Sequence, residues 1–165
     1  GHFAHGNTTS STHRIAADLM DKGANNVQIY ERVFNTFSHS RSKLFGYCLY
    51  KKLEVIPELK TALLYLNADE LEEFNVITGD TEGLVNFGLG LEGIVFSVLI
   101  IDRTERVKMS FRSKGSFAAN AFAAKHFNGG GHFNAAGGAS DNSLEDTISM
   151  FKNALKDHKD ELLGV

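Results

Sequence analysis

Three consecutive glycines followed directly by a histidine are the residues of this chain whose types best suit chemistry. Gly129, Gly130 and Gly131 have no side chains, so the backbone there can take positive φ and turn its N–H groups toward an anion. His132 follows directly and adds a titratable hydrogen-bond donor. Small residues continue through 135–138, so either another backbone segment or a ligand can approach closely. The pattern predicts a phosphate- or nucleotide-binding turn, and the alternative is a tight buried turn with an incidental histidine.

A second candidate group lies at the end of an alternating segment. Apolar and polar residues alternate over 107–112, which predicts an amphipathic strand with one face on the core. The other face carries Lys108, Ser110 and Arg112 in a row. The Arg112 guanidinium and the Ser113 hydroxyl together could hold a phosphate. The alternative is a cation at a strand edge with a salt-bridge partner.

Two glycine motifs that suggest nucleotide binding do not fit their context. Residues 88–93 have the spacing Gly-x-Gly-x-x-Gly, but the dinucleotide fingerprint needs a helix after it, and here an apolar strand is predicted over 94–101. The glycines at 129–131 are not followed by Gly-Lys-Ser or Gly-Lys-Thr, so they are no P-loop.

The seven histidines raise the question of a metal site. His2 and His5 lie in a predicted loop, where their spacing carries little geometric meaning. His126 and His132 flank the glycines, but no carboxylate is near them in sequence. We therefore expect this chain to hold no metal ion by itself, and the roles of His2, His5 and His126 stay open. Three other histidines are expected to be solvated: His13, His39 and His158.

Composition is that of an ordinary globular protein. The 165 residues are 42% hydrophobic and 22% charged, and the net charge of −3 gives no general basic field for long nucleic acid. The one cysteine, Cys48, is expected in the core and fits a reducing cytoplasm. The longest apolar run, 94–101, is too short to span a bilayer. With no initiator Met, the chain is expected to be a fragment of a longer protein.

Helical and strand periodicities change near residue 52. Three short helices are expected before it, from about Thr12, from Asn25 or Asn26, and over about 40–51. After it, strands are predicted at 53–56, 61–66, 94–101, 107–112 and 133–139. Helices are predicted after the capping box 67–70, over 117–127 and after Ser143, while 79–89 is ambiguous. This order indicates an α/β domain with a mixed, roughly five-stranded sheet flanked by helices.

The combination of Phe111, Arg112 and Ser113 with Asn120 and the stretch 129–137 resembles the DHHA1 domain of DHH-type phosphoesterases. Within that family the chain is most similar to bifunctional oligoribonucleases and 3′-phosphoadenosine-5′-phosphate (pAp) phosphatases, also called nanoRNases or exopolyphosphatase-related proteins. The stretches 81–86 and 1–16 share this similarity, the latter with the end of a DHH domain. The resemblance implies that residues 1–51 are the end of a DHH domain and a helical linker, and that 52–165 are a DHHA1 substrate-binding domain.

The resemblance also implies a function. The family hydrolyses short oligoribonucleotides, pAp or both, with divalent metal ions, usually two manganese ions, held by Asp and His residues of the DHH domain. No Asp-His-His motif is present here, so the chain is expected to recognise substrate and to be inactive alone. His132 is expected to contact the scissile or the adjacent phosphate. The expected substrate-binding residues are Arg112, Ser113, Asn120, Gly129, Gly130 and Gly131.

Expected partners are short oligonucleotides or nucleotide phosphates and the protein's own DHH domain, with no membrane, and a homodimer is left open. Three alternatives remain. One is a non-catalytic nucleic-acid-binding module, as appended to alanyl-tRNA synthetases. The second is part of a RecJ-like single-strand exonuclease. The third is a purely structural oligomerisation domain.

Overall fold

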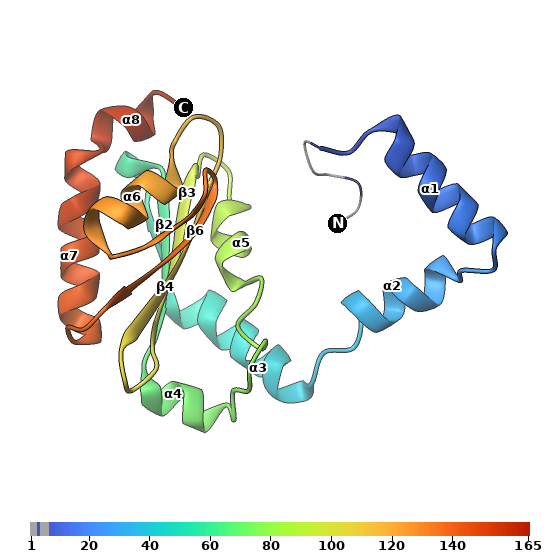
Figure 1. Cartoon of the computed structure of the whole chain (residues 1–165). Helices are drawn as coiled ribbons and strands as arrows, with labels where there is room; N and C mark the ends of the chain where they lie inside the picture. The colour runs from blue at the N-terminus through green and yellow to red at the C-terminus, as the bar shows by residue number, and fades with distance from the viewer. Residues whose placement is uncertain (1–2, 4–6) are drawn as a thin grey trace. The chain divides into compact units, whose positions relative to one another are not determined.

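The structure is a computed structural model that describes Phe3 and residues 7–165 (Figure 1). Contacts divide the chain into two compact units, Gly1–Ser38 and His39–Val165. The second unit includes α3 (His39–Tyr47), which the sequence assigns to the helical linker before residue 52.

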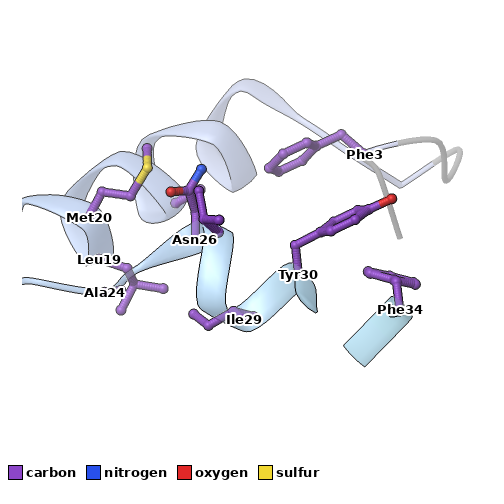
Figure 2. A pocket seen from close by; sticks show the side chains of 10 residues that line it. Phe3, Leu19, Met20, Ala24, Asn26, Ile29, Tyr30 and Phe34 are labelled. Carbon is purple, nitrogen blue, oxygen red and sulfur yellow. The ribbon is translucent and has the colours of Figure 1, made fainter. Parts of the chain in front are cut away.

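The first unit contains two helices, α1 (Ser10–Asp21) and α2 (Asn26–Phe34). Thr9 caps α1, and the side chain of Asn25 caps α2 by accepting from Gln28 N at 3.0 Å. The predicted helices are therefore confirmed, with Asn25 as the cap of the second. Apolar side chains on the two helices line an open groove of ≈ 550 Å³, and Figure 2 shows Leu19 and Tyr30 among them.

A six-stranded mixed sheet forms the centre of the second unit. Its strands are β1 (Leu53–Ile56), β2 (Thr61–Leu66), β3 (Phe96–Asp102), β4 (Val107–Ser113), β5 (Gly130–His132) and β6 (Ala135–Ser140). Their order in space is β1-β2-β3-β4-β6-β5, in which only β2 and β3 pair in parallel. The predicted mixed α/β fold is confirmed. The sheet has six strands rather than roughly five because Gly130–His132 pairs with β6.

Helices and short turns of helix connect and cover these strands. After α3 come a π-helical turn (Cys48–Lys52), a 3₁₀ turn (Pro57–Leu59), α4 (Ala68–Glu73), α5 (Leu84–Leu89), α6 (Ala119–His126), α7 (Leu144–Asp157) and α8 (Lys159–Leu163). The predicted capping box opens α4: Asn67 Oδ1 accepts from Glu70 N at 2.8 Å, and Asn67 N donates to Glu70 Oε2 at 2.9 Å. The ambiguous segment 79–89 is a turn that leads into α5.

Each sheet face has its own core. On one face, α6, α7 and α8 enclose an aromatic cluster, and Figure 1 shows these helices together on one side of the sheet. Its fully buried rings are Phe96, Phe111, Phe117, Phe122 and Phe151. On the other face, α3 and α5 cover aliphatic residues of β2 and β3. The prediction that β3 is buried on both sides is confirmed.

A thiol and a carboxyl group are buried beside the second core. Cys48 is fully buried, as expected, and burial raises the pKa of its thiol to about 12. Glu70 is buried beside Lys52 and Tyr47. Burial opposes ionisation of Glu70, but hydrogen bonds from Lys52, Tyr47 and the Asn67 N–H outweigh it and lower the pKa of the carboxyl. None of the described helices is both long and apolar enough to cross a bilayer.

Candidate functional site

The alternation along β4 separates its core residues from its polar residues. Val107, Met109 and Phe111 belong to the aromatic core. Lys108, Ser110 and Arg112 point to the other face, as predicted, with Lys108 exposed and the other two half-buried. α5 contacts β4 as well as β2 and β3, so it borders this row without covering it completely. The row therefore remains partly accessible, most of all at Lys108.

The strand register brings His132 to the same face as Arg112. Arg112 lies opposite Ala135 of β6, and Ala135 lies opposite His132 of β5. Directly paired residues of neighbouring strands point to the same side of a sheet. Two strand spacings place the Cα atoms of His132 and Arg112 about 10 Å apart. The residue between them carries only a methyl group, so both long side chains border the same open surface.

A second row beside this one has almost no side chains. Gly130 pairs with Gly137, which in turn pairs with Ser110 of β4. A Cβ added at Gly130 would meet no heavy atom within 4 Å, and one at Gly137 would meet only Met109 O at 3.6 Å. Neither glycine is therefore required by its own packing. Together they form a flat floor between His132 and the β4 row.

Packing explains why the other two residues of the triplet, Gly129 and Gly131, are glycines. A Cβ on Gly129 would lie 2.1 Å from Gly137 O, and one on Gly131 would lie 2.6 Å from Ala135 O. Gly131 also has φ +144°, which favours glycine. These two residues are small because β5 lies tightly against β6.

A phosphate-binding turn would require the backbone N–H groups of Gly129, Gly130 and Gly131 to converge on one point, and they do not. Gly129 N already donates to Ala123 O at 3.1 Å, and Gly130–His132 is an edge strand. In an antiparallel pair, N–H groups alternately face the partner and face away. The predicted turn is therefore replaced by an exposed strand edge, which offers only alternate N–H groups to a ligand.

Ser113 does not share a side with Arg112, so the expected joint contact of their side chains with one phosphate is wrong. Ser113 is buried, donates to Phe117 O at 2.6 Å and accepts from Asn134 Nδ2 at 2.9 Å. The alternation of a strand puts successive residues on opposite faces. Ser113 instead fastens the turn that leads from β5 into β6.

Asn120 belongs to α6, which covers the aromatic core rather than the polar row. Its Oδ1 accepts from Ala121 N at 2.8 Å, and its backbone N–H reaches Phe133 O at 3.4 Å. The structure therefore places it beside the β5–β6 turn, not beside Arg112.

A cavity of ≈ 510 Å³ adjoins the polar row and was not predicted from the sequence. It is lined on one side by Arg103, Lys108 and Arg112 and on the other by the segment that leads into α5, including Thr81 and Asn86. Within the described part of the chain, none of these three cations forms an ion pair. Glu82 is the acidic residue in the lining, so positive charge prevails.

The contacts of these cations leave them available to an anion. Arg112 Nη1 donates to Phe111 O at 2.8 Å, which fixes the guanidinium but leaves most of its donors unused. Arg103 Nη2 reaches Thr81 Oγ1 at 3.4 Å. In the sequence, Arg103 belongs to a charged segment that is typical of a turn. The only signal that it lies on the same face as Lys108 is its position directly after β3.

The remaining histidines differ from expectation at one position. His158 is buried at 8% exposure and is not solvated, because it packs against His126 and the aromatic core. His13 and His39 are exposed, as predicted. His2 and His5 lie outside the described residues. Burial, and then the neighbouring His158, lowers the pKa of His126.

Among the described residues, no group of three or more His, Cys, Asp or Glu side chains could hold a metal ion. The family resemblance assigns the catalytic metal centre to a DHH domain, and the described residues offer no comparable set of ligands.

Comparison with known sequences gives consistent matches. The family profile described as "DHHA1 domain" matches residues 59–159. A "Bifunctional oligoribonuclease and PAP phosphatase NrnA" from Thermus thermophilus is 35% identical over 139 residues, covering 83% of this chain and 40% of the relative. The protein of the same name from Bacillus subtilis is 27% identical over 132 residues, covering 80% of this chain and 41% of the relative.

Solved structures agree with these matches. An exopolyphosphatase-related protein from Bacteroides fragilis superimposes with a TM-score of 0.92 and 38% identity, over 97% of this chain and 47% of that one. A pGpG-specific phosphodiesterase from Vibrio shares the fold, with a TM-score of 0.55 and 16% identity, over 95% of this chain and 53% of that one. The chain thus spans about two fifths of its curated relatives.

Proposed function

Given that this chain belongs to the DHHA1 domain family, we propose that it is the substrate-recognition part of a DHH-type phosphoesterase. The substrates that we propose are short oligoribonucleotides, 3′-phosphoadenosine-5′-phosphate, or both. The similarity to two bifunctional oligoribonuclease and PAP phosphatase proteins supports this substrate class.

The observation that carries the proposal is the shared face of His132 and Arg112. Their side chains border one open surface, with Lys108 and Arg103 in the adjoining cavity. A surface that has several unpaired cations and a floor of glycine residues suits a ligand with more than one phosphate group. Since the overall net charge is −3, the attraction is local and favours short substrates over long nucleic acid.

Each residue has a proposed role. His132 contacts the scissile phosphate and donates a hydrogen bond to the charge that develops there. Arg112, with its planar fork of donors, holds a neighbouring or terminal phosphate. Gly130 lets the ligand approach the strand, and an outward N–H of β5 supplies one more donor. Gly129, Gly131 and Ser113 shape this surface without touching the ligand, and Asn120 supports the β5–β6 turn.

The chemistry of hydrolysis is proposed to need the protein's own DHH domain. Divalent metal ions, manganese in our proposal, would be held there rather than by this chain. The DHHA1 domain would close over the substrate and fix its phosphates. We propose a cytoplasmic location for the protein.

Binding by the isolated chain tests the site directly. We expect pAp or a diribonucleotide to bind residues 1–165 at millimolar to high micromolar strength, because only part of the site is present and each charged hydrogen bond contributes about 1.5–3 kcal/mol. A ¹⁵N NMR titration should shift the amides of Gly130, His132 and the β4 row. Arg112→Ala should weaken binding by about 10–150-fold.

Lys152→Ala is the matched control, because it also removes one positive charge but lies on α7 and pairs with Glu54 of β1. It should leave binding unchanged. Equal losses in Arg112→Ala and Lys152→Ala would mean that the attraction is only general charge and that the site is wrongly placed. Tight, salt-sensitive binding of long RNA would favour the non-catalytic nucleic-acid-binding module instead.

Turnover by the complete protein tests the role of His132. We expect His132→Ala to lower turnover by about a hundredfold, in the range of losing one donor to developing charge. The isolated chain supplied with manganese should not cleave a dinucleotide. Unchanged turnover would remove His132 from the reaction.

A further inference from the structure

Two histidines from different helices meet on the side of the sheet opposite His132 and Arg112. His126 is the last residue of α6, and His158 lies at the corner between α7 and α8. Their Nε2 atoms are 3.0 Å apart and their ring planes cross at 82°. The two nitrogens that could bind an ion therefore face each other.

A carboxylate orients one of the two rings. Nδ1 of His158 lies 3.0 Å from Oε1 of Glu161, three residues farther along the chain. In the tautomer that carries its proton on Nδ1, His158 donates to this carboxylate, and the lone pair of Nε2 is then directed toward His126. Histidines that bind metal ions commonly have such a partner on the other ring nitrogen, because it fixes the tautomer and the ring orientation.

A neighbouring aromatic ring limits movement of both histidine rings. The Phe122 ring lies 5.2 Å from that of His158 and 5.0 Å from that of His126, and His158 is buried. His126 is half-buried, so the pair remains open to water. Two imidazole nitrogens on one tetrahedral zinc ion lie about 3.3 Å apart at ordinary bond lengths, so little rearrangement would be needed.

We propose that His126 and His158 together bind one Zn²⁺ ion, which ties the end of α6 to the α7–α8 corner. Imidazole is a favoured ligand of zinc and of the neighbouring divalent transition metals. No third His, Cys, Asp or Glu joins them within the described residues, so water completes the coordination. Two protein ligands supply about half of the binding free energy of a four-ligand site, which gives a dissociation constant of roughly 1–200 μM.

The sequence could not indicate this site because the two ligands are 32 residues apart. The site is also separate from the proposed substrate face, which allows the two to be tested independently. Since α6 leads directly to Gly129 and β5, zinc should stabilise the anchor of that strand without contacting the substrate.

The test is a titration of residues 1–165 with zinc chloride near pH 7.5, followed by calorimetry and by ¹⁵N NMR of the histidine rings. We expect one equivalent to bind and the Nε2 signals of His126 and His158 to shift. At a free zinc concentration ten times the dissociation constant, the folding equilibrium constant should rise about elevenfold. Glu161→Gln should weaken zinc binding by about tenfold or more.

His126→Gln should abolish the binding, while its amide can still form a hydrogen bond with His158. His39→Gln is the matched control, because His39 is exposed and distant in sequence from both ligands. Binding that does not saturate, that shifts other histidines instead, or that survives His126→Gln would overturn the proposal. If His126→Gln fails to fold, Glu161→Gln decides, since the Glu161 side chain is 62% exposed; an unchanged affinity there overturns the proposal too.

Discussion

Replacing each of the three consecutive glycines by alanine should separate a structural requirement from a functional one. A methyl group on Gly129 would lie 2.1 Å from Gly137 O and 2.9 Å from Gly138 Cα, both backbone atoms that move only with the strand. On Gly131 it would lie 2.6 Å from Ala135 O, at φ +144°. On Gly130 it would meet nothing within 4 Å.

The magnitudes follow from these contacts. Overpacking costs about 1–3 kcal/mol and more where the backbone must shift, so Gly129→Ala should lower the free energy of unfolding by about 3 kcal/mol or more. Gly131→Ala combines a clash with strained φ and should cost about 2–3 kcal/mol. Gly130→Ala should change the free energy of unfolding by less than about 1 kcal/mol, because alanine also restricts the unfolded chain.

Urea unfolding followed by circular dichroism measures the three effects. At a slope of about 1–3 kcal/mol per molar urea, a loss of 3 kcal/mol moves the midpoint by about 1–3 M. Gly130→Ala should keep the wild-type midpoint but weaken dinucleotide binding by about tenfold, because its methyl group projects from the floor beside His132. Gly130→Ala as unstable as Gly129→Ala would refute the placement of β5, and a stable Gly130→Ala with full affinity would refute the approach of the ligand to that floor.

Three further predictions concern other parts of the second unit. Ser113→Ala should lower the free energy of unfolding in urea by about 1–3 kcal/mol, because one buried and one partly buried hydrogen bond are lost, while the affinity for a dinucleotide stays unchanged. The pKa of Glu70 is lowered in the folded state, so the stabilisation from its ionised carboxylate is complete above the ordinary value of 4.5 and is lost as the pH falls through the lower folded pKa. Glu70→Gln should remove this acid dependence of the unfolding midpoint. An unchanged pH profile in the variant would contradict the assignment. The thiol of Cys48 should react with a disulfide reagent at pH 8 only after unfolding, because it is buried and its pKa is raised to about 12; rapid labelling of the native chain would show that the second core is open.

Much of the fold could be predicted because the relevant signals are local. The alternation of β4 placed Lys108, Ser110 and Arg112 on one face, and the unbroken apolar run of β3 indicated burial on both sides. The same alternation, continued by one residue, puts Ser113 in the core. The expected joint contact of Arg112 and Ser113 with one phosphate is therefore at odds with the strand period, which was already visible in the sequence.

The errors of greater consequence lie where local chemistry is ambiguous. Three consecutive glycines suit a tight turn as well as an extended edge strand. Pairing with another strand decides between the two conformations, and that pairing cannot be recognised from the glycines themselves. The close approach to β6 makes Gly130–His132 a strand. For the same reason the two glycines that must be small, Gly129 and Gly131, could not be told from Gly130, which has open space around it.

The sequence by itself determined the elements, the polar row of β4, and the residue types suited to binding phosphate, because side-chain periodicity and capping act over a few residues. Only the tertiary structure decided which of these residues meet. The register of β6 between β4 and β5 brings Arg112 to the face of His132 across Ala135, and helix packing brings His126 to His158. Such contacts depend on strand order and on the packing of whole elements, which arise from the summed burial of the core and not from the residues that meet.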